Sequence, residues 1–234
     1  MKLVIVRHGE SEYNKLNLFS GWEDVHLTEK GIREAQAAGR SIRQAGIQFS
    51  VGFTSVLSRS IQSMHYILYE INQEWLPVYK TWRLNERSYG ALQRLNKEET
   101  AARLGRERVA RWRRSYDAMP PLLEMSDPRH PCHDRRYAGL DPRLLPAGES
   151  LKTTQKRVLP CWSDQIAPHL CKGENVLVVS HRNTLRALLK YLENISDEDI
   201  INVDIPTGVP VVYEFDQQLA IVSKKELTSE PVGE

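Results

Sequence analysis

Two histidines stand directly after two apolar segments of this chain, each next to an arginine. The apolar run 3–6 is followed by Arg7 and His8, and the run 176–179 leads through a serine to His181. A neutral imidazole is a nucleophile near pH 7, and a guanidinium is a permanently charged donor that fits phosphate oxygens. The repeated arrangement predicts a phosphoryl-transfer site in which His8 is the nucleophile.

The two apolar runs predict the strands that would bring these histidines together. Four consecutive aliphatic residues, rich in β-branched types, are typical of strands in a parallel sheet that is buried on both faces. In open α/β sheets, ligands bind at the carboxyl ends of the strands. We therefore expect His8 and His181 at one edge of the sheet.

An arginine follows a further predicted strand, over 51–54. Arg59 lies on the opening turn of a helix predicted over 57–72. It is expected to converge with Arg7 on one phosphate, assisted by His181 and by the amide dipoles of that helix. For Arg59 taken alone, the alternative is an ordinary surface arginine.

A carboxylic acid follows the strand predicted over 76–79. Glu86 stands within the segment 83–90, between two arginines. Phosphoryl transfer needs a proton source for the leaving oxygen, so Glu86 is the candidate proton shuttle. An ordinary surface pair of glutamate and arginine is the alternative.

The order of the predicted elements indicates an α/β fold. The chain has 234 residues, a mass of 26.9 kDa and a formal net charge of +2, which suit one domain spanning 1–234. Strands that alternate with helices predict a three-layer sandwich with a mainly parallel sheet flanked by helices. Besides the elements above, helices are expected over 29–45, 98–116 (one or two), 149–167 with a bend at Pro160, and 184–193, and a strand over 211–215.

Two segments lack the pattern of a helix or a strand. Six prolines lie between residues 119 and 146, which predicts a long active-site loop able to act as a lid. The polar residues 224–234 are expected to form a flexible tail.

Composition also limits the compartment and the partners. No apolar run is long enough to cross a bilayer, and the first strand begins too early for a signal peptide, so we expect a cytoplasmic protein without a membrane partner. Cys132, Cys161 and Cys171 lack the spacing of a zinc site and are expected to be free thiols. Glu98 and Glu99 precede the six arginines within 103–114 and Glu107 interrupts them, and no nucleic-acid-binding motif is present, so no nucleic-acid partner is expected.

The motifs of the chain closely resemble those of the cofactor-dependent phosphoglycerate mutases of the histidine phosphatase superfamily. The resemblance extends from residue 3 to about residue 215. It rests on Arg7-His8-Gly9-Glu10-Ser11, Asn14, Ser20-Gly21-Trp22, Thr54-Ser55-Val56-Leu57, Arg83-Leu84-Asn85-Glu86-Arg87, Trp112-Arg113-Arg114, His181 to Lys190 and Pro206-Thr207-Gly208-Val209-Pro210.

The resemblance implies a role for each candidate residue. His8 would be phosphorylated, Glu86 would donate and accept the proton, and His181 would stabilise the transition state. The transferring phosphate would be held by Arg7, Asn14, Arg59 and Asn183. The rest of the substrate would be bound by Ser20, Gly21, Tyr89, Lys97, Arg113 and Arg114, with Ser11, Arg87 and Arg182 as further substrate-binding candidates.

The resemblance also implies a reaction and its requirements. Members interconvert 2- and 3-phosphoglycerate in glycolysis and gluconeogenesis, with 2,3-bisphosphoglycerate as phosphoryl primer and without a metal. The implied partners are a small phosphorylated acid as substrate and further copies of the chain in a homodimer or homotetramer. Ser11 favours a mutase over the related bisphosphoglycerate mutases, which tend to carry glycine there. A bisphosphoglycerate mutase or phosphatase and an attenuated phospho-ligand-binding protein are the alternatives.

Two positions depart from the family pattern. Arg182 stands where the family has glycine, and Ser88 stands where many relatives have histidine. The Arg182 side chain would either clash with the ligand or turn outward and add a cation, and it would be strained if its φ angle had to be positive. We expect Arg182 to lower turnover by misplacing His181 or the local backbone amide.

Overall fold

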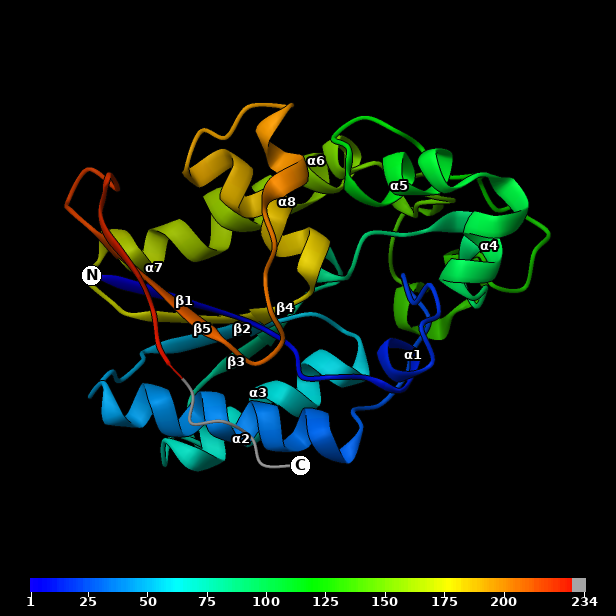
Figure 1. The fold of residues 1–234 in the computed structure, drawn as a ribbon. Coiled ribbons are helices and arrows are strands. Elements are labelled where there is room, and N and C mark those ends of the chain that lie inside the picture. Colours follow the sequence, from blue (N-terminus) through cyan, green and yellow to red (C-terminus); the bar gives the residue numbers. More distant parts are fainter. Residues whose placement is uncertain (229–234) are drawn as a thin grey trace.

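The computed structural model describes residues 1–228, and its strands form one mixed six-stranded sheet (Figure 1). The strand order is β3-β2-β4-β1-β5-β6, in which β1, β2, β3 and β4 run parallel and β5 runs antiparallel to both of its neighbours. The strands span Lys2–Arg7 (β1), Val51–Thr54 (β2), Val78–Lys80 (β3), Val176–Ser180 (β4), Pro210–Phe215 (β5) and Ile221–Glu226 (β6).

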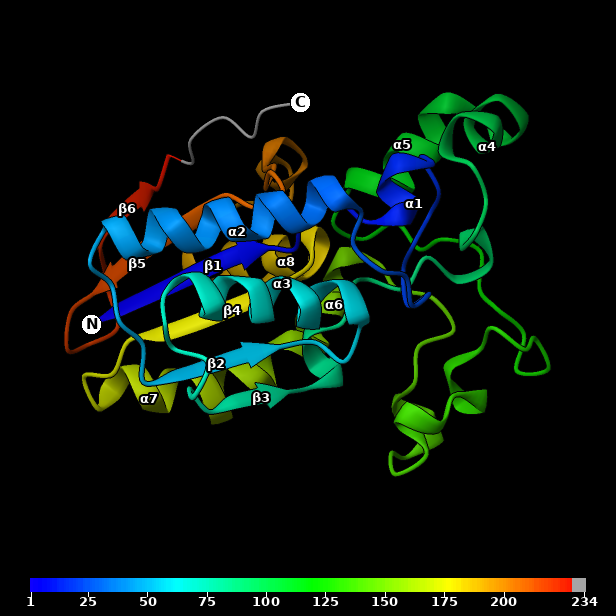
Figure 2. The same cartoon turned by 90° about the horizontal axis from the view of Figure 1, so that it is seen from below.

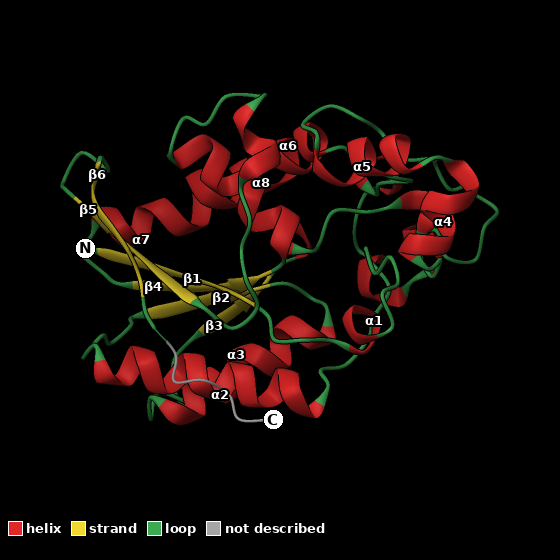
Figure 3. Cartoon of the chain, in the orientation of Figure 1, coloured by secondary structure: helices red, strands yellow, loops and turns green. Residues whose placement is uncertain are grey.

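Helices cover both faces of this sheet, which confirms the predicted three-layer sandwich (Figures 1 and 3). One face carries α2 (Glu29–Gln44) and α3 (Ser58–Glu70), and the other carries α6 (Leu151–Cys161), α7 (Ala167–Cys171) and α8 (Arg182–Leu192). Three shorter helices, α1 (Glu12–Lys15), α4 (Lys97–Leu104) and α5 (Arg106–Arg114), lie beyond the carboxyl ends of the parallel strands. None of the helices within residues 1–228 has the length and apolar character needed to cross a membrane.

The core explains the uninterrupted apolar runs. Leu3 and Ile5 of β1 pack in the cluster beneath α6 and α8, whereas Val4 and Val6 pack in the cluster against α2 and α3. Successive side chains of a strand point to opposite faces, so a strand covered on both sides must be apolar at every position. All four side chains are at most 1% exposed.

The C-terminal prediction was partly wrong. Residues 224–226, expected within the flexible tail, belong to β6, which pairs with β5 as a hairpin; residues 229–234 of that predicted tail lie outside the described residues. Most side chains of β6 are exposed, so this edge strand carries no apolar alternation in its sequence. The third strand was also shifted: it begins at Val78 rather than at residue 76.

Two predicted helices are interrupted. The segment 98–116 forms α4 and α5 because Gly105 between them takes φ +98°, a conformation that L side chains rarely adopt. In 149–167, α6 passes through Pro160 and continues as a π-helical turn, Trp162–Ile166, before α7 begins. The predicted disturbance near Pro160 thus takes the form of this wider turn.

The proline-rich segment 119–146 has no strand and no α-helix, only three short 3₁₀ turns: Pro131–His133, Arg135–Tyr137 and Pro142–Leu144. It extends away from the sheet in Figure 2. Arg129 donates to the carbonyl of Gln93 at 3.1 Å, and Asn85 donates to the Tyr137 hydroxyl at 2.8 Å. The segment thus supports the backbone of residues 85–93; its closing over a ligand stays a prediction.

The three cysteines are free thiols, as expected. Cys161 is buried, and this burial raises the pKa of its thiol to about 12.

Candidate active site

The pairing of β1 with β4 places the two histidines side by side. Arg7 is in register with Ser180, and the next backbone amide, that of His8, donates to the Ser180 carbonyl at 3.0 Å. His8 and His181 therefore leave the sheet at the same edge, with ring centroids 4.9 Å apart and an interplanar angle of 61°. Both rings are buried, and the predicted meeting of the two strand ends is confirmed.

The surroundings of His8 keep its imidazole neutral. Burial, followed by the charges of Arg59 and Arg7, holds the pKa of His8 well below its ordinary value of 6.5. Its Nδ1 lies 2.7 Å from the carbonyl oxygen of Gly9. A carbonyl can only accept, so Nδ1 carries the hydrogen and Nε2 retains a lone pair. The side chain is thereby prepared as a nucleophile at Nε2.

His181 also presents a free ring nitrogen. Its Nε2 is hydrogen-bonded to the Ser55 hydroxyl at 2.8 Å, while its buried Nδ1 has no partner within residues 1–228. Burial and the charge of Arg59 hold the pKa of His181 well below 6.5. An unpartnered buried nitrogen costs free energy, which a ligand atom could recover.

Arg59 is a cation held by backbone carbonyls. Its two terminal nitrogens donate to the carbonyls of Glu23 at 2.8 Å and Gly21 at 2.9 Å, and the side chain is 1% exposed. Burial lowers its pKa to about 10, so it stays charged at neutral pH. Gly21 has φ +53°, and a Cβ there would collide with the side chain of Gln93, so the turn requires glycine.

The first amide of α3 is not free for a ligand. Ser58 donates its backbone N–H to the carboxylate of Asp24 at 2.7 Å and its hydroxyl to the same carboxylate at 2.9 Å. This acidic side chain already occupies the positive end of the helix. The expected help from the amide dipoles of α3 is therefore reduced.

Arg7 also projects into this region. Its Nη1 donates to the Ile205 carbonyl at 2.9 Å, whereas its buried Nε has no partner within residues 1–228. Burial lowers the pKa of Arg7. Like His181, Arg7 keeps one buried polar atom available to an anion.

A cavity of about 310 Å³ opens at this edge of the sheet. Five cationic and two carboxylate side chains line it, so it favours anions. Most of the predicted site residues line it, namely Arg7, Asn14, Ser20, Gly21, Glu86, Tyr89, Lys97, Arg113, Arg114, Arg182 and Asn183, together with Leu18 and Asp204, which the sequence did not indicate.

Five predicted site residues do not line this cavity: His8, His181, Arg59, Ser11 and Arg87. The first three are the buried groups described above. Ser11 caps α1 and donates its hydroxyl to Asn14 Oδ1 at 2.9 Å, which leaves the amide nitrogen of Asn14 for a ligand. Binding of substrate by Ser11 itself stays a prediction.

Arg87 lies behind the cavity wall. Its guanidinium lies 4.6 Å from the ring centroid of Tyr89 and donates to the carbonyl of Arg113 at 3.1 Å. It therefore positions two residues that line the cavity.

A second buried arginine, Arg186, performs a similar task and was missed in the sequence. It donates to the amide oxygen of Asn183 at 2.9 Å and to the carbonyl of Arg114 at 3.0 Å. Asn183 in turn donates its side-chain N–H to the Tyr89 hydroxyl at 3.2 Å. These contacts fix the C-terminal end of α5 against the start of α8.

The carboxyl group of Glu86 has one oxygen bonded to the protein. Its Oε1 accepts the backbone N–H of Arg87 at 2.8 Å and that of Asn183 at 3.2 Å. Its Oε2 has no hydrogen-bond partner among the described residues, and the side chain lines the cavity. One oxygen fixes the side chain while the other can exchange a proton with a ligand.

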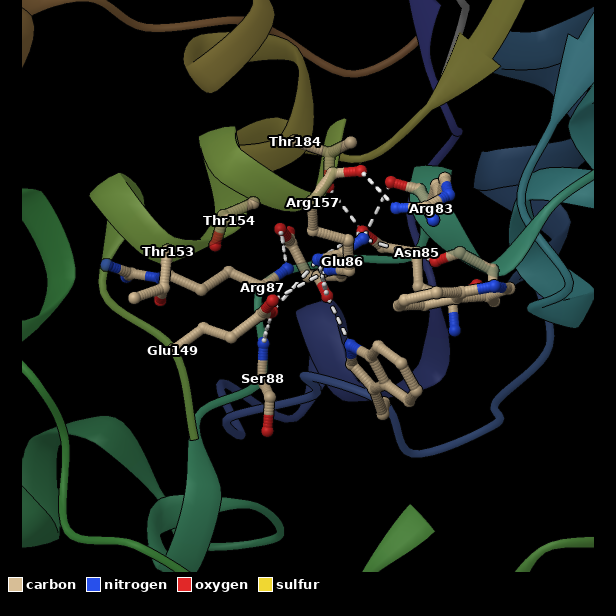
Figure 4. Close-up of polar contacts among 12 residues, drawn as sticks. Arg83, Asn85, Glu86, Arg87, Ser88, Glu149, Thr153, Thr154, Arg157 and Thr184 are labelled. Atoms are coloured by element: carbon tan, nitrogen blue, oxygen red, sulfur yellow. Dashed lines mark hydrogen bonds and ion pairs between the residues drawn. The ribbon is translucent and has the colours of Figure 1, made fainter. Parts of the chain in front are cut away.

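A buried ion pair holds the backbone of this segment, and it too was missed in the sequence (Figure 4). Arg157 binds the Glu149 carboxylate through two nitrogens, at 2.7 and 2.9 Å. The same guanidinium donates to the carbonyls of Arg83 at 2.7 Å and Glu86 at 3.2 Å, and both charged side chains are at most 5% exposed. The Glu86 carbonyl also accepts the indole N–H of Trp22 at 2.6 Å.

The two departures from the family pattern are accommodated without strain. Arg182 is the first residue of α8, and its φ angle is not positive. The backbone strain expected for a positive φ angle is therefore absent at this residue. Its side chain turns toward Asp204 and still lines the cavity. Ser88 is buried, and its hydroxyl accepts the backbone N–H of Gly90 at 3.3 Å. Lower turnover caused by Arg182 stays a prediction.

We predict that Arg157→Met lowers the free energy of unfolding by about 3 to 5 kcal/mol, because it leaves the Glu149 carboxylate buried without its partner. Urea unfolding at pH 7.5 measures the change. Arg143→Met is the matched control: Arg143 pairs with Asp141, but its side chain is 88% exposed, and the variant should unfold like the parent. Equal stabilities of the two variants would contradict the role of the buried pair.

We predict that the protein loses stability as the pH falls below 6.5. His8 and His181 bind protons less readily in the folded state than in the unfolded state, so acidification favours unfolding. Each histidine should contribute a slope of up to about 1.4 kcal/mol per pH unit below its unfolded pKa. Urea unfolding between pH 7.5 and 5.5 should show a shallower dependence for the double variant His8→Gln/His181→Gln. If the free energy of unfolding fell equally with pH in the parent and in the double variant, His8 and His181 would not be the cause of the pH dependence.

Solved structures of other proteins share this fold. A phosphoglycerate mutase from Bacillus anthracis is 20% identical, with a TM-score of 0.65 over 98% of this chain and 92% of that chain. A mycobacterial glucosyl-3-phosphoglycerate phosphatase is 22% identical, with a TM-score of 0.70 over 91% of this chain and 92% of its own. At such identities the likeness establishes the fold alone.

Closer relatives extend the comparison to sequence. The 2,3-bisphosphoglycerate-dependent phosphoglycerate mutase 2 of Lactiplantibacillus plantarum is 55% identical over 97% of this chain and 98% of its own length. The 2,3-bisphosphoglycerate-dependent phosphoglycerate mutase 1 of Lactobacillus johnsonii is 53% identical over the same shares. The family model of the histidine phosphatase superfamily (branch 1) matches residues 3–130 and 124–226. The chain therefore belongs to the histidine phosphatase superfamily.

Proposed function

We propose that this protein is a 2,3-bisphosphoglycerate-dependent phosphoglycerate mutase, which interconverts 2- and 3-phosphoglycerate in glycolysis and gluconeogenesis through a phosphohistidine at His8. The observation that carries the proposal is the buried His8 with a free Nε2, beside the half-buried Arg7 and the buried Arg59. The names of relatives more than half identical over nearly the whole chain support the same reaction.

The first transfer uses His8, Glu86 and the two cations Arg7 and Arg59. The Nε2 lone pair of His8 forms a bond to phosphorus while the phosphate ester P–O bond breaks. Glu86 gives its proton to the leaving oxygen, which becomes a hydroxyl group. The oxygens of the transferring phosphoryl group carry negative charge, which the guanidinium groups of Arg7 and Arg59 stabilise.

The free polar atoms of three predicted site residues fit a phosphate. Arg7 Nε and His181 Nδ1 are buried without a partner among the described residues. The amide nitrogen of Asn14 is free because its oxygen is committed to Ser11. A bound phosphate would supply acceptors to the donors among these groups, without breaking contacts already made.

In the second transfer the phosphoryl group on His8 passes to the free hydroxyl group of a phosphoglycerate, which becomes the bisphosphate; the first transfer, repeated on the other phosphate of this bisphosphate, then releases the isomer. A hydroxyl oxygen attacks phosphorus, the N–P bond breaks, and the hydroxyl proton passes to Glu86. The substrate must be held by its other anionic groups for this step, a role we assign to Lys97, Arg113 and Arg114, which line the cavity. Burial, with a further contribution from Arg113, lowers the pKa of Lys97, and an anionic ligand would oppose that effect.

The proposed enzyme needs 2,3-bisphosphoglycerate to phosphorylate His8 at the outset and needs no metal. Its substrate is a small phosphorylated acid. Assembly into a homodimer or homotetramer stays a prediction from the family resemblance.

The test is conversion of 3-phosphoglycerate to 2-phosphoglycerate in excess EDTA, with and without catalytic 2,3-bisphosphoglycerate. We expect turnover that resists EDTA and is stimulated by the primer. His8→Ala should lose a factor of about 10³ or more in kcat, because the nucleophile is gone. Glu86→Gln should lose about 10²- to 10⁴-fold, because the proton shuttle is gone.

His65→Ala is the matched control, since His65 is an exposed histidine of α3 and its loss should leave kcat unchanged. Turnover abolished by EDTA, or retained in His8→Ala, would contradict the proposal. A folded parent protein that binds phosphoglycerate without turnover would favour an attenuated phospho-ligand-binding protein.

A further inference from the structure

We propose that Arg182 makes the cavity selective for the more highly charged ligand, so that an acid with two phosphate groups is preferred over one with a single phosphate group. The inference rests on the proposed function, because it concerns the primer and the substrate of the same cavity. We assign the preference for the primer over the substrate to the side chain of Arg182 and its acidic neighbour Asp204.

Asp204 holds Arg182 by one nitrogen only. The Nε of Arg182 donates to Asp204 Oδ1 at 2.7 Å, and the same oxygen accepts the backbone N–H of Ile205 at 2.8 Å, so the carboxylate is itself fixed. Within residues 1–228 the two terminal nitrogens of Arg182 have no hydrogen-bond partner. Arg157, by contrast, has all three of its nitrogens bonded to protein atoms. Arg182 therefore keeps two donor groups for a ligand.

The charge of Arg182 acts on two other cations that line the cavity. Arg182 contributes to lowering the pKa of Arg7, at the end of β1, and that of Lys97, at the start of α4, although burial is the larger cause for each. The Arg182 side chain is 17% exposed, so solvent screens it less than a surface charge. An anion in the cavity will therefore interact with this cation.

The other cations already have partners in a singly phosphorylated ligand. Arg7 and Arg59 are assigned to the transferring phosphate, and Lys97, Arg113 and Arg114 are assigned to the remaining anionic group. A second phosphate adds about two negative charges. These charges match donors that a monophosphate leaves unused, and the Coulomb attraction to a cation grows in proportion to ligand charge.

Asp204 fixes Arg182 without removing this difference. Its carboxylate partly neutralises Arg182 and so reduces the attraction for both ligands, but the attraction still grows with the charge of the ligand. A doubly phosphorylated ligand can bind the two free nitrogens without breaking the bond between Nε and Asp204.

The test measures binding in a His8→Ala background, where no phosphoryl transfer occurs. Isothermal titration calorimetry gives Kd for 2,3-bisphosphoglycerate and for 3-phosphoglycerate in that protein and with Arg182→Gln or Arg182→Lys added. Arg182→Gln removes the charge and should raise Kd about tenfold for the bisphosphate but less than about threefold for the monophosphate. Arg182→Lys keeps the charge and should stay within about threefold of the His8→Ala parent for both ligands.

Several results would overturn the inference. Equal weakening of both ligands by Arg182→Gln, or no weakening of either, would show that Arg182 does not discriminate. Bisphosphate binding by Arg182→Lys as weak as that by Arg182→Gln would show that the charge is not the cause. Thermal unfolding of each variant checks that the fold is intact.

The outcomes also separate the two proposals. Lack of turnover by the unmodified protein would contradict the proposed function, yet the binding comparison would still test Arg182. Absence of binding of both ligands to the folded His8→Ala protein would overturn both proposals.

Discussion

The rest of the structure depends on one constraint: the imidazoles of His8 and His181 must lie beside the guanidinium groups of Arg7 and Arg59 even when no anion is bound. His8 and His181 are adjacent because β1 and β4 pair in parallel register, and burial, followed by the charges of Arg59 and Arg7, holds the pKa of His8 well below its ordinary value. Burying such charges without compensation would cost several kcal/mol each. The surrounding chain is arranged to reduce that cost without neutralising the charge.

Backbone carbonyls provide this compensation. Arg59 donates to the carbonyls of residues 21 and 23, and Arg7 donates to that of Ile205, so dipoles satisfy the donors while the positive charge is retained. A carboxylate in the same place would have cancelled the charge that a phosphate needs. Because these donors are already oriented, binding a phosphate requires little rearrangement, which is the condition for strong electrostatic stabilisation.

Two carboxylates lie outside the phosphate-binding groups and hold the segments around them. The Arg157–Glu149 pair is buried, and Arg157 fixes the carbonyls of residues 82, 83, 85 and 86 (Figure 4). Glu86, on this segment, lines the cavity. Asp24 similarly occupies the start of α3, next to Arg59. Arg157, which is paired with a carboxylate, thus supports the frame, whereas Arg7 and Arg59, which are held by carbonyls, keep their full charge for the ligand.

Local patterns in the sequence predict one part of this site, and the family resemblance predicts another part. The strands β1 and β4 and the histidines at their ends follow from local patterns, because an apolar run and the residues after it are neighbours in the chain, whereas most of the cavity wall was predicted only from the family resemblance. The family resemblance supplied the roles of residues such as Lys97 and Asn183, which no local pattern distinguishes.

The supporting contacts were missed because their partners are distant in sequence. Arg157 binds carbonyls more than 70 residues away, and Arg186 binds that of Arg114, 72 residues away. Asp204 carries no motif of its own and became evident only as the neighbour of Arg182. The edge strand β6 was missed because its exposed, polar side chains give no alternation.

The most direct test of this account is the position of the phosphoryl group on the protein. After incubation of the unmodified protein with 2,3-bisphosphoglycerate, mass spectrometry at neutral to alkaline pH and phosphorus NMR would locate it. The account predicts a single phosphohistidine at His8, bonded through Nε2, because Nδ1 donates to the Gly9 carbonyl. Phosphorylation of another residue, or attachment through Nδ1 of His8, would contradict it.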